Sequence, residues 1–295
     1  MSETIGRTEP RVVHITSRDN PLVQRIRKLG QDPVSYRKLG QIWLEGDHLC
    51  SAALNRQVPL LEAVIADTAW TGEHGVALPS DASAVSLSAL ARQAARVVVV
   101  PEALWRQFST LESPTRLGAL MAWPGASGAD DAGNAASTPA STTCGLLASA
   151  RTVVLDRVQD AGNVGSILRS ACAMGVEQVV ALKGSAALWS PKVLRAAMGA
   201  HFGLHVVEQI EPDQLCELQV PLVATSSHTD QMLPTLRLPD PCAWLFGHEG
   251  QGVSATLLSR CDLTVGIPQP GGEESLNVAA AAAVCLYEAM RQRLI

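Results

Sequence analysis

The stretch from Thr152 to Met174, TVVLDRVQDAGNVGSILRSACAM, decides the fold of the second half of the chain. It opens with an apolar, β-branched run, residues 152–155, which is typical of a buried strand. From Val164 onward the apolar residues recur at helical spacing, so we expect a helix that ends near Met174. A strand that leads into a helix over a short connection is the repeating unit of an α/β domain.

The same alternation continues to the end of the chain. Strands are predicted over 178–182, 204–207, 220–224, 243–246 and 263–267, and helices over 191–198 and 276–293. Strands that alternate with helices in this way imply a parallel sheet covered on both faces. In such sheets, ligands bind beyond the carboxyl ends of the strands.

The first half of the chain reads as a smaller α/β domain. A helix is predicted over 21–29, with Asn20 as its N-cap and Pro21 at its first position. Short strands are predicted over 42–44, 61–66 and 96–100. Between the halves, a segment rich in Gly, Ala, Ser, Thr and Pro reads as a flexible linker. The predicted domains are therefore 1–122, a linker over 123–150, and 151–295.

Composition narrows the class of protein. The chain has 295 residues, of which 47% are hydrophobic and 17% charged, so it can bury a sizeable core and wholesale disorder is excluded. No apolar run approaches the roughly 20 residues of a membrane span, and the first residues lack the apolar region of a secretory signal. Seven cysteines without a CxxC pair do not form a disulfide framework, and we expect a reducing, cytoplasmic location.

The net charge of -5 hides a basic stretch between residues 11 and 40. This stretch contains seven basic and two acidic residues, which give it a local charge of +5. The basic residues are Arg11, Arg18, Arg25, Arg27, Lys28, Arg37 and Lys38. Such a patch is what phosphate binding needs, although a solvated helix face would have the same composition.

Three segments place glycines and polar side chains at predicted strand ends. In the first, residues 156–170, Gly162 and Gly165 allow close approach of the backbone, and helix N-terminal amides can meet an anion. From spacing alone, Asn163 reads as a plain N-cap. Arg169 could form a surface ion pair, but its apolar neighbours on both sides disfavour a solvated role.

The second segment, WLFGHEGQG (244–252), carries Glu249 among glycines, where a tight turn is the alternative explanation. The third, VGIPQPGGEESLNVA (265–279), leads into the last helix. Ser275 is a good N-cap for that helix, whereas Asn277 is a poor residue for its first turn.

Several common chemistries are not supported by the sequence. The glycine spacing matches neither GxGxxG nor the phosphate-binding loop of nucleotide hydrolases. GxSxG and HExxH are absent, and the histidines show no ligand spacing beyond the weak His201/His205 pair, which reads as structural or incidental. We therefore expect no metal.

In this order and spacing, the three segments closely resemble the SpoU/TrmH family of S-adenosylmethionine-dependent RNA ribose 2′-O-methyltransferases. The match is carried by NVG (163–165) with Arg169, by FGHEGQG (246–252), and by IP (267–268) through SLNV (275–278). SPKVLRAAMGA (190–200) is also typical of the family. ITSRDNP (15–21) and LEG (44–46) resemble the small RNA-binding domain that many members carry.

The resemblance implies a deep C-terminal trefoil knot, S-adenosylmethionine as methyl donor, and a homodimer whose knot helices pack together. By match, the catalytic residues would be Arg169, Asn163, Glu249, Ser275 and Asn277. The cofactor-binding residues would be Leu245, Phe246, Gly247, Gly252, Ile267, Pro268, Gln269, Leu276 and Asn277. Gln269 stands where family members usually carry Met, and Glu273 and Glu274 add charge to the same loop.

A guanidinium holds its proton far above neutral pH, so Arg169 is expected to act as an oriented cation rather than as a literal base. RNA contact, with rRNA favoured over tRNA, is assigned to Arg18, Arg25, Lys28, Arg37, Lys192 and Arg195. Two alternatives stay open: a methyltransferase that acts on a base atom such as guanine N1, and a non-catalytic RNA-binding relative.

Overall fold

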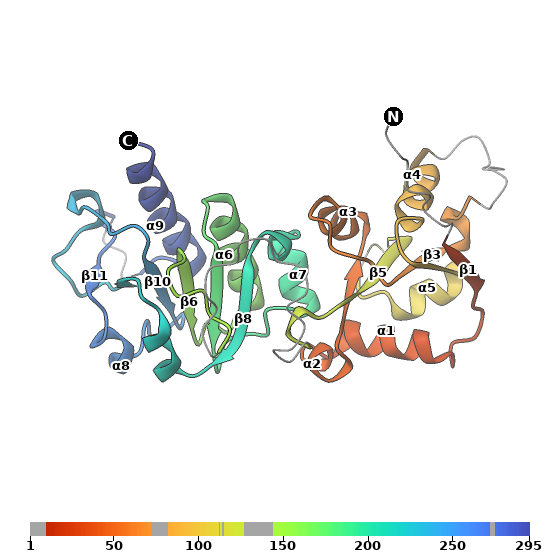
Figure 1. Ribbon diagram of the computed structural model, residues 1–295, viewed down its shortest axis with the longest axis horizontal. Helices are drawn as coiled ribbons and strands as arrows, with labels where there is room; N and C mark the ends of the chain where they lie inside the picture. The colour runs from red at the N-terminus through yellow and green to blue at the C-terminus, as the bar shows by residue number, and fades with distance from the viewer. Residues whose placement is uncertain (1–9, 72–81, 112, 114, 127–143, 272–274) are drawn as a thin grey trace, which may run out of the picture. The chain divides into compact units, whose positions relative to one another are not determined.

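The computed structural model describes residues 10–71, 82–111, 113, 115–126, 144–271 and 275–295. The chain divides into two compact units, Met1–Ser127 and Gly128–Ile295. Each unit is built on its own sheet (Figure 1). Most of the predicted linker lies outside the described residues.

The first unit has a five-stranded sheet in the order β1-β4-β3-β5-β2. Its strands are β1 (Arg11–His14), β2 (Gln41–Glu45), β3 (Glu62–Ala66), β4 (Arg96–Val100) and β5 (Leu117–Ala122). Strand β5 runs antiparallel to both of its neighbours, whereas the other pairs are parallel. The predicted α/β character is confirmed, but β1 and β5 were not predicted.

Within the described residues, five α-helices accompany this sheet. They are α1 (Pro21–Gln31), α2 (Ser35–Leu39), α3 (Asp47–Asn55), α4 (Ala82–Ala91) and α5 (Glu102–Phe108). The predicted cap of α1 is confirmed, because the Asn20 side chain accepts a hydrogen bond from the amide of Leu22 at 2.9 Å. Trp43, Trp105 and Phe108 form a buried aromatic cluster where α5 meets the sheet.

The second unit has a six-stranded sheet in the order β11-β9-β10-β6-β7-β8, and every pairing in it is parallel. The strands are β6 (Thr152–Asp156), β7 (Gln178–Leu182), β8 (His205–Ile210), β9 (Leu222–Thr225), β10 (Ala243–Gly247) and β11 (Leu263–Val265). The helices are α6 (Ala161–Ala173), α7 (Pro191–Ala197), α8 (Ala255–Leu258) and α9 (Val278–Arg293). The predicted parallel sheet is confirmed. The chain runs outward from β6 through β7 to β8 and then crosses to β9 on the other side of β6, with β10 between them, so β6 and β10 flank the point where strand order reverses.

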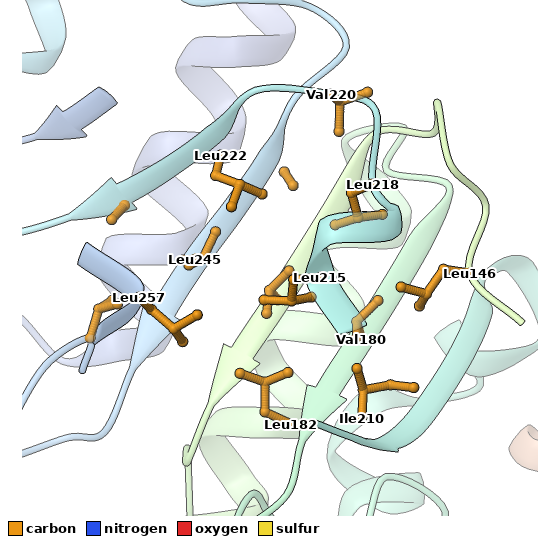
Figure 2. Packing of buried hydrophobic residues seen from close by; sticks show 14 residues of the cluster. Leu146, Val180, Leu182, Ile210, Leu215, Leu218, Val220, Leu222, Leu245 and Leu257 are labelled. Atoms are coloured by element: carbon orange, nitrogen blue, oxygen red, sulfur yellow. The ribbon is translucent and has the colours of Figure 1, made fainter. Parts of the chain in front are cut away.

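Both faces of this sheet are buried, which explains why its strands are continuously apolar. On one face, side chains such as Val180 and Leu245 pack against Leu215 and Leu257 (Figure 2). Helices α6 and α9 lie behind the sheet in that view, and α6 packs against both α7 and α9.

The predicted linker extends too far toward the C-terminus. Leu146 is fully buried in the core of the second unit. The backbone of Leu147 is held on both sides by the buried Gln178 side chain, at 2.7 and 3.3 Å. The described residues from 144 onward therefore belong to the second unit. In the sequence, Leu146 marks this boundary, because it is a large apolar residue after a run of small ones.

The knot that the resemblance implies stays a prediction. The segment between β9 and β10 lies against the residue that follows β11, since the amide of Leu233 donates to Gly266 and that of Gly266 to Gln231, both at 2.8 Å. It also lies against α9, where Gln292 bonds to the backbone of Leu236 and Leu238. Among the helices within the described ranges, none has the length and apolar character that crossing a bilayer requires.

Candidate active site

The three glycine-bearing turns meet at the carboxyl ends of β6 and β10. Glu249, just after β10, accepts a hydrogen bond from the Asn163 side-chain amide at 3.2 Å. The Asn163 side-chain oxygen in turn accepts from the Asn277 amide at 2.9 Å. A chain of side-chain hydrogen bonds, Glu249–Asn163–Asn277, thus joins segments that are 86 and 114 residues apart in sequence.

Glu249 is held as a carboxylate by the turn that precedes α6. Its oxygens accept hydrogen bonds from the backbone amides of Asp160 at 3.0 Å and Gln159 at 3.3 Å. Partial burial acts to raise the pKa of Glu249, but the hydrogen bonds from backbone amides and from Asn163 outweigh it and lower the pKa. The side chain is therefore ionised near neutral pH and orients Asn163 by accepting from its amide.

The caps of both helices that meet here differ from the predicted ones, by three residues toward the N-terminus for α6 and by two toward the C-terminus for α9. Helix α6 is capped by Asp160, whose Oδ1 accepts from the Asn163 amide at 2.8 Å, so Asn163 is not the cap. Helix α9 is capped by Asn277, whose side chain accepts from the amides of Ala279 and Ala280, so Ser275 is not the cap. Because Asp160 caps α6, the Asn163 side chain is free to link Asn277 to Glu249.

Glycines shape the turns in two different ways. A Cβ at Gly247 would lie 2.0 Å from the backbone of Gly252, so the end of the loop after β10 packs directly against the last residue of β10. Gly252 has φ +66°, and a Cβ there would meet nothing within 4 Å. Gly165, expected to approach a ligand, instead faces α7, where a Cβ would lie 2.3 Å from the Cβ of Ala196.

Two predicted catalytic residues stand apart from the hydrogen-bonded chain. Arg169 lies six residues after Asn163 on α6, roughly 9 Å along the helix axis. Its side chain is exposed, contrary to the expectation from its apolar neighbours, and no described residue forms a hydrogen bond or ion pair with it. Ser275 is also exposed.

The predicted cofactor-binding residues differ in whether their side chains or only their backbone can contact a ligand. The side chains of Leu245 and Phe246 are fully buried in the core, so only their backbone could reach a ligand. Leu276 is 42% exposed, and Ile267 and Pro268 are accessible. The Oε1 atom of Gln269 is buried and accepts no hydrogen bond from the described residues. Glu273 and Glu274 lie outside the described residues.

The predicted RNA-binding side chains are also unequal. Arg18 and Lys28 are exposed. Arg25 is instead ion-paired with Glu62 at 3.3 Å. Arg37 and Arg195 are partly buried and have partners within the fold. Lys192 lies 3.9 Å from Asp160 and is 67% exposed, which places a cation beside the N-terminus of α6.

Other features of the second unit lie outside the site. A groove of about 430 Å³ is lined by Met174, Leu233, Val284 and Tyr287, at the opposite end of α6 from Asn163. Of the predicted structural histidines, His201 is buried against Trp189 and His205 bonds to Gly145. In the part of the chain that the structure describes, no cluster of three or more His, Cys, Asp or Glu is placed to hold a metal ion.

Sequence reasoning missed the pair that begins the site, Asp156 and Arg157. Asp156 is buried at the end of β6 and accepts from the amide of Ser254 at 2.7 Å. Arg157 bonds to Asp156 and to Gln251 across the turn. An acidic-basic pair directly after a buried strand is the signal that could have found them.

Comparison with known proteins agrees with this geometry. A family model described as the SpoU rRNA methylase family matches residues 150–287. A tRNA/rRNA methyltransferase of Synechocystis, itself uncharacterized, is 32% identical over 96% of this chain and 95% of its own length. The chain belongs to the SpoU rRNA methylase family. It is accordingly an RNA methyltransferase, and the resemblance drawn from the three segments is confirmed.

Two further similar proteins show how the similarity is distributed along the chain. The 23S rRNA (guanosine(2553)-2′-O)-methyltransferase RlmP of Bacillus subtilis is 40% identical over 48% of this chain, which spans 58% of that relative's length. The SpoU methyltransferase AviRb of Streptomyces viridochromogenes, solved in complex with AdoMet, has a TM-score of 0.74 at 24% identity, with 93% of this chain and 98% of AviRb covered. AviRb therefore has the fold of both units.

Proposed function

We propose that this protein transfers the methyl group of S-adenosylmethionine to a ribose 2′-hydroxyl of rRNA. The observation that carries the proposal is the Glu249–Asn163–Asn277 chain, which links the turns after β6, β10 and β11 at one edge of the sheet. The names of the 2′-O-methyltransferase RlmP and of AdoMet-bound AviRb support the reaction and the methyl donor.

The residues present fit this cofactor. The buried Oε1 of Gln269 is an acceptor without a partner among the described residues, as a group that bonds a ligand amine would be. The backbone of Gly252 borders open space. Together with Gly247, Ile267, Pro268 and Leu276, these groups would hold S-adenosylmethionine mainly through backbone and apolar contacts.

Bound S-adenosylmethionine would supply a methyl group on a sulfonium, which is already a good leaving group, so the protein has mainly to position the ribose and stabilise its oxygen. The exposed Arg169 would supply a fixed positive charge that stabilises the developing 2′-oxyanion and lowers the pKa of the hydroxyl. Asn163 is oriented by Glu249 and Asn277 and presents its polar side chain to the ribose. Ser275 lies next to this chain in sequence and would contact the substrate.

RNA would be held by exposed cations in both units, with Arg18 and Lys28 in the first and Lys192 in the second. We further propose that the chain forms a homodimer through α9, which exposes apolar side chains, and that the N-terminal unit favours rRNA over tRNA. The contacts of the exposed cations with RNA are electrostatic and recognise the shape of the RNA more than its sequence.

The test compares the wild-type protein with Arg169→Ala and Arg169→Lys on rRNA from cells that lack the gene. We expect Arg169→Ala to bind RNA and S-adenosylmethionine normally while turnover falls at least 100-fold, with partial activity in the Lys variant. Full turnover by Arg169→Ala would refute its role. Digestion of the methylated RNA locates the methyl group: a methylated base would favour the base-directed alternative, and no binding of S-adenosylmethionine would favour the non-catalytic one.

A further inference from the structure

Arg157, the first residue after β6, has an unusual backbone. Its φ is +60°, in the left-handed region that residues other than Gly, Asn and Asp seldom adopt. Such a conformation persists only where surrounding interactions hold it, and it is frequent at ligand clamps. The interactions that hold Arg157 therefore indicate what shapes the neighbouring loop, residues 248–254.

The guanidinium of Arg157 spans two segments. Nε donates to Oδ1 of Asp156 at 3.0 Å, and Nη1 donates to Oε1 of Gln251 at 3.0 Å. Asp156 is only 4% exposed, and its Oδ2 also accepts from the amide of Ser254 at 2.7 Å. The stem of Arg157 passes over Gly184, where a Cβ would lie 3.2 Å from its Cγ.

These bonds fix the far half of the loop that follows β10. The near half, at Glu249, is already held by the amides of Gln159 and Asp160 and by Asn163. The far half, from Gln251 to Ser254, is held by Arg157 and Asp156. Without Arg157, nothing described would connect the Gln251 side chain to β6.

We infer that Arg157 is a positioning residue that holds the 248–254 loop in the shape that binds the methyl donor. With this left-handed backbone, the guanidinium reaches Gln251 in the loop after β10 while it stays bonded to Asp156. The inference rests on the proposed function, because that loop is assigned to S-adenosylmethionine.

The decisive variant is Arg157→Gly, because glycine accepts the left-handed backbone and removes only the side chain. We expect the KM for S-adenosylmethionine and its Kd by calorimetry to rise five- to tenfold. The KM for RNA and kcat should change less than twofold. The melting temperature should fall modestly, because loss of the guanidinium leaves the buried Asp156 carboxylate without its cation. Gln209→Gly is the matched control, since Gln209 is exposed, has φ +63° and lies on the edge strand β8, away from the loop. The control should leave both constants for S-adenosylmethionine unchanged.

A second comparison isolates the bond to Gln251. Gln251→Ala should raise the Kd for S-adenosylmethionine by a similar factor, and the double variant should be no worse than Arg157→Gly alone. Arg157→Lys should not restore binding, because a single ammonium cannot bond both partners in this geometry. Hydrogen exchange without cofactor should be faster at residues 250–254 in Arg157→Gly.

The outcomes separate the two proposals. If the wild-type protein does not bind S-adenosylmethionine, the proposed function fails. If the wild-type protein binds it and Arg157→Gly binds it equally well, or if affinity falls only in proportion to a lower melting temperature, the positioning role is wrong.

Discussion

At the residue scale, Asn277 performs two tasks that a single substitution can separate. Its Oδ1 caps α9, and its amide nitrogen donates to Asn163. Asn277→Asp keeps the capping oxygen but cannot donate, so we predict stability within about 0.5 kcal/mol of the wild type and at least tenfold lower turnover. Asn277→Ala should lose about 1 kcal/mol of unfolding free energy as well as turnover.

Urea denaturation and methyl-transfer assays on the two variants check this prediction. Asn277→Ser serves as a control for capping alone, since serine caps a helix well but is too short to replace the amide. Turnover that follows stability across the three variants would mean that the bond to Asn163 has no separate role.

His201 makes the protein sensitive to acid. Its Nε2 donates to the carbonyl of Leu188 at 2.7 Å, so Nδ1 is unprotonated, and it is buried without a described partner. Burial lowers the pKa of His201 from 6.5 to about 4. The unfolded chain therefore binds a proton at higher pH than the folded chain. Stability is fully present above pH 6.5 and is lost as pH falls toward 4, by roughly 3 kcal/mol.

Urea midpoints measured from pH 7.5 to 4 test this dependence. His201→Gln keeps a donor for Leu188 but does not titrate, so its curve should be flatter over that range although its stability at pH 7.5 is lower. Parallel curves for the two proteins would assign the acid sensitivity to other groups.

At the element scale, the crossing of α6 and α7 depends on Gly165. Alanine in a helix interior is normally favoured over glycine by about 1 kcal/mol. Here its Cβ would lie 2.3 Å from the Cβ of Ala196 and 2.9 Å from the carbonyl of Val193, and overpacking of this kind costs about 1–3 kcal/mol. We predict that Gly165→Ala lowers the unfolding free energy by about 1 kcal/mol. Ser166→Ala, exposed on the same helix, should change it by less than about 0.5 kcal/mol. Stabilisation by Gly165→Ala in denaturant titrations would contradict the packing argument.

The elements that sequence predicted well are those whose burial pattern is local. Strand β7 is found over its predicted residues, because all five are buried and the run is bounded by polar residues. Strand β1 has only half-buried valines between exposed ends and was missed, since an edge strand carries a weaker apolar signal. Strand β5 was missed because its Gly-Ala-Leu-Met sequence has little β-branched character, although Gly118 is required against Trp43.

The site was predictable where short motifs mark it and not where contacts join distant segments. Glu249, Asn163 and Asn277 were each identified within a motif, and the structure joins them. The cap of each helix depends on where the backbone turns helical, and several nearby polar residues can serve as the cap. Asn163 was therefore predicted in place of Asp160, and Ser275 in place of Asn277. The bond from Arg157 to Gln251 spans 94 residues and has no local signature.

At the scale of the whole molecule, the acidic chain must bind an acidic polymer through local charge. We predict that replacing both Arg18 and Lys28 with Gln weakens rRNA binding and reduces the slope of log affinity against log salt by about 1.5. Arg106→Gln, exposed but paired with Glu102, is the control and should leave the slope unchanged. Filter binding from 50 to 200 mM salt measures the slope, and an unchanged slope in the double variant would exclude these two residues from the RNA contact.

The exposed face of α9 carries the prediction of self-association. Val284 and Tyr287 are 43% and 53% exposed beside the groove that Met174 and Leu233 line, and such a patch is a typical surface for a second copy of the chain. We expect sedimentation to give twice the mass of the chain for the wild type and the mass of one chain for Tyr287→Asp combined with Val284→Asp. Val85→Asp, an equally exposed valine of the first unit, should remain dimeric. Because Asn277 caps α9, loss of the dimer should also lower turnover. A monomeric variant with full activity would show that one chain completes the site by itself.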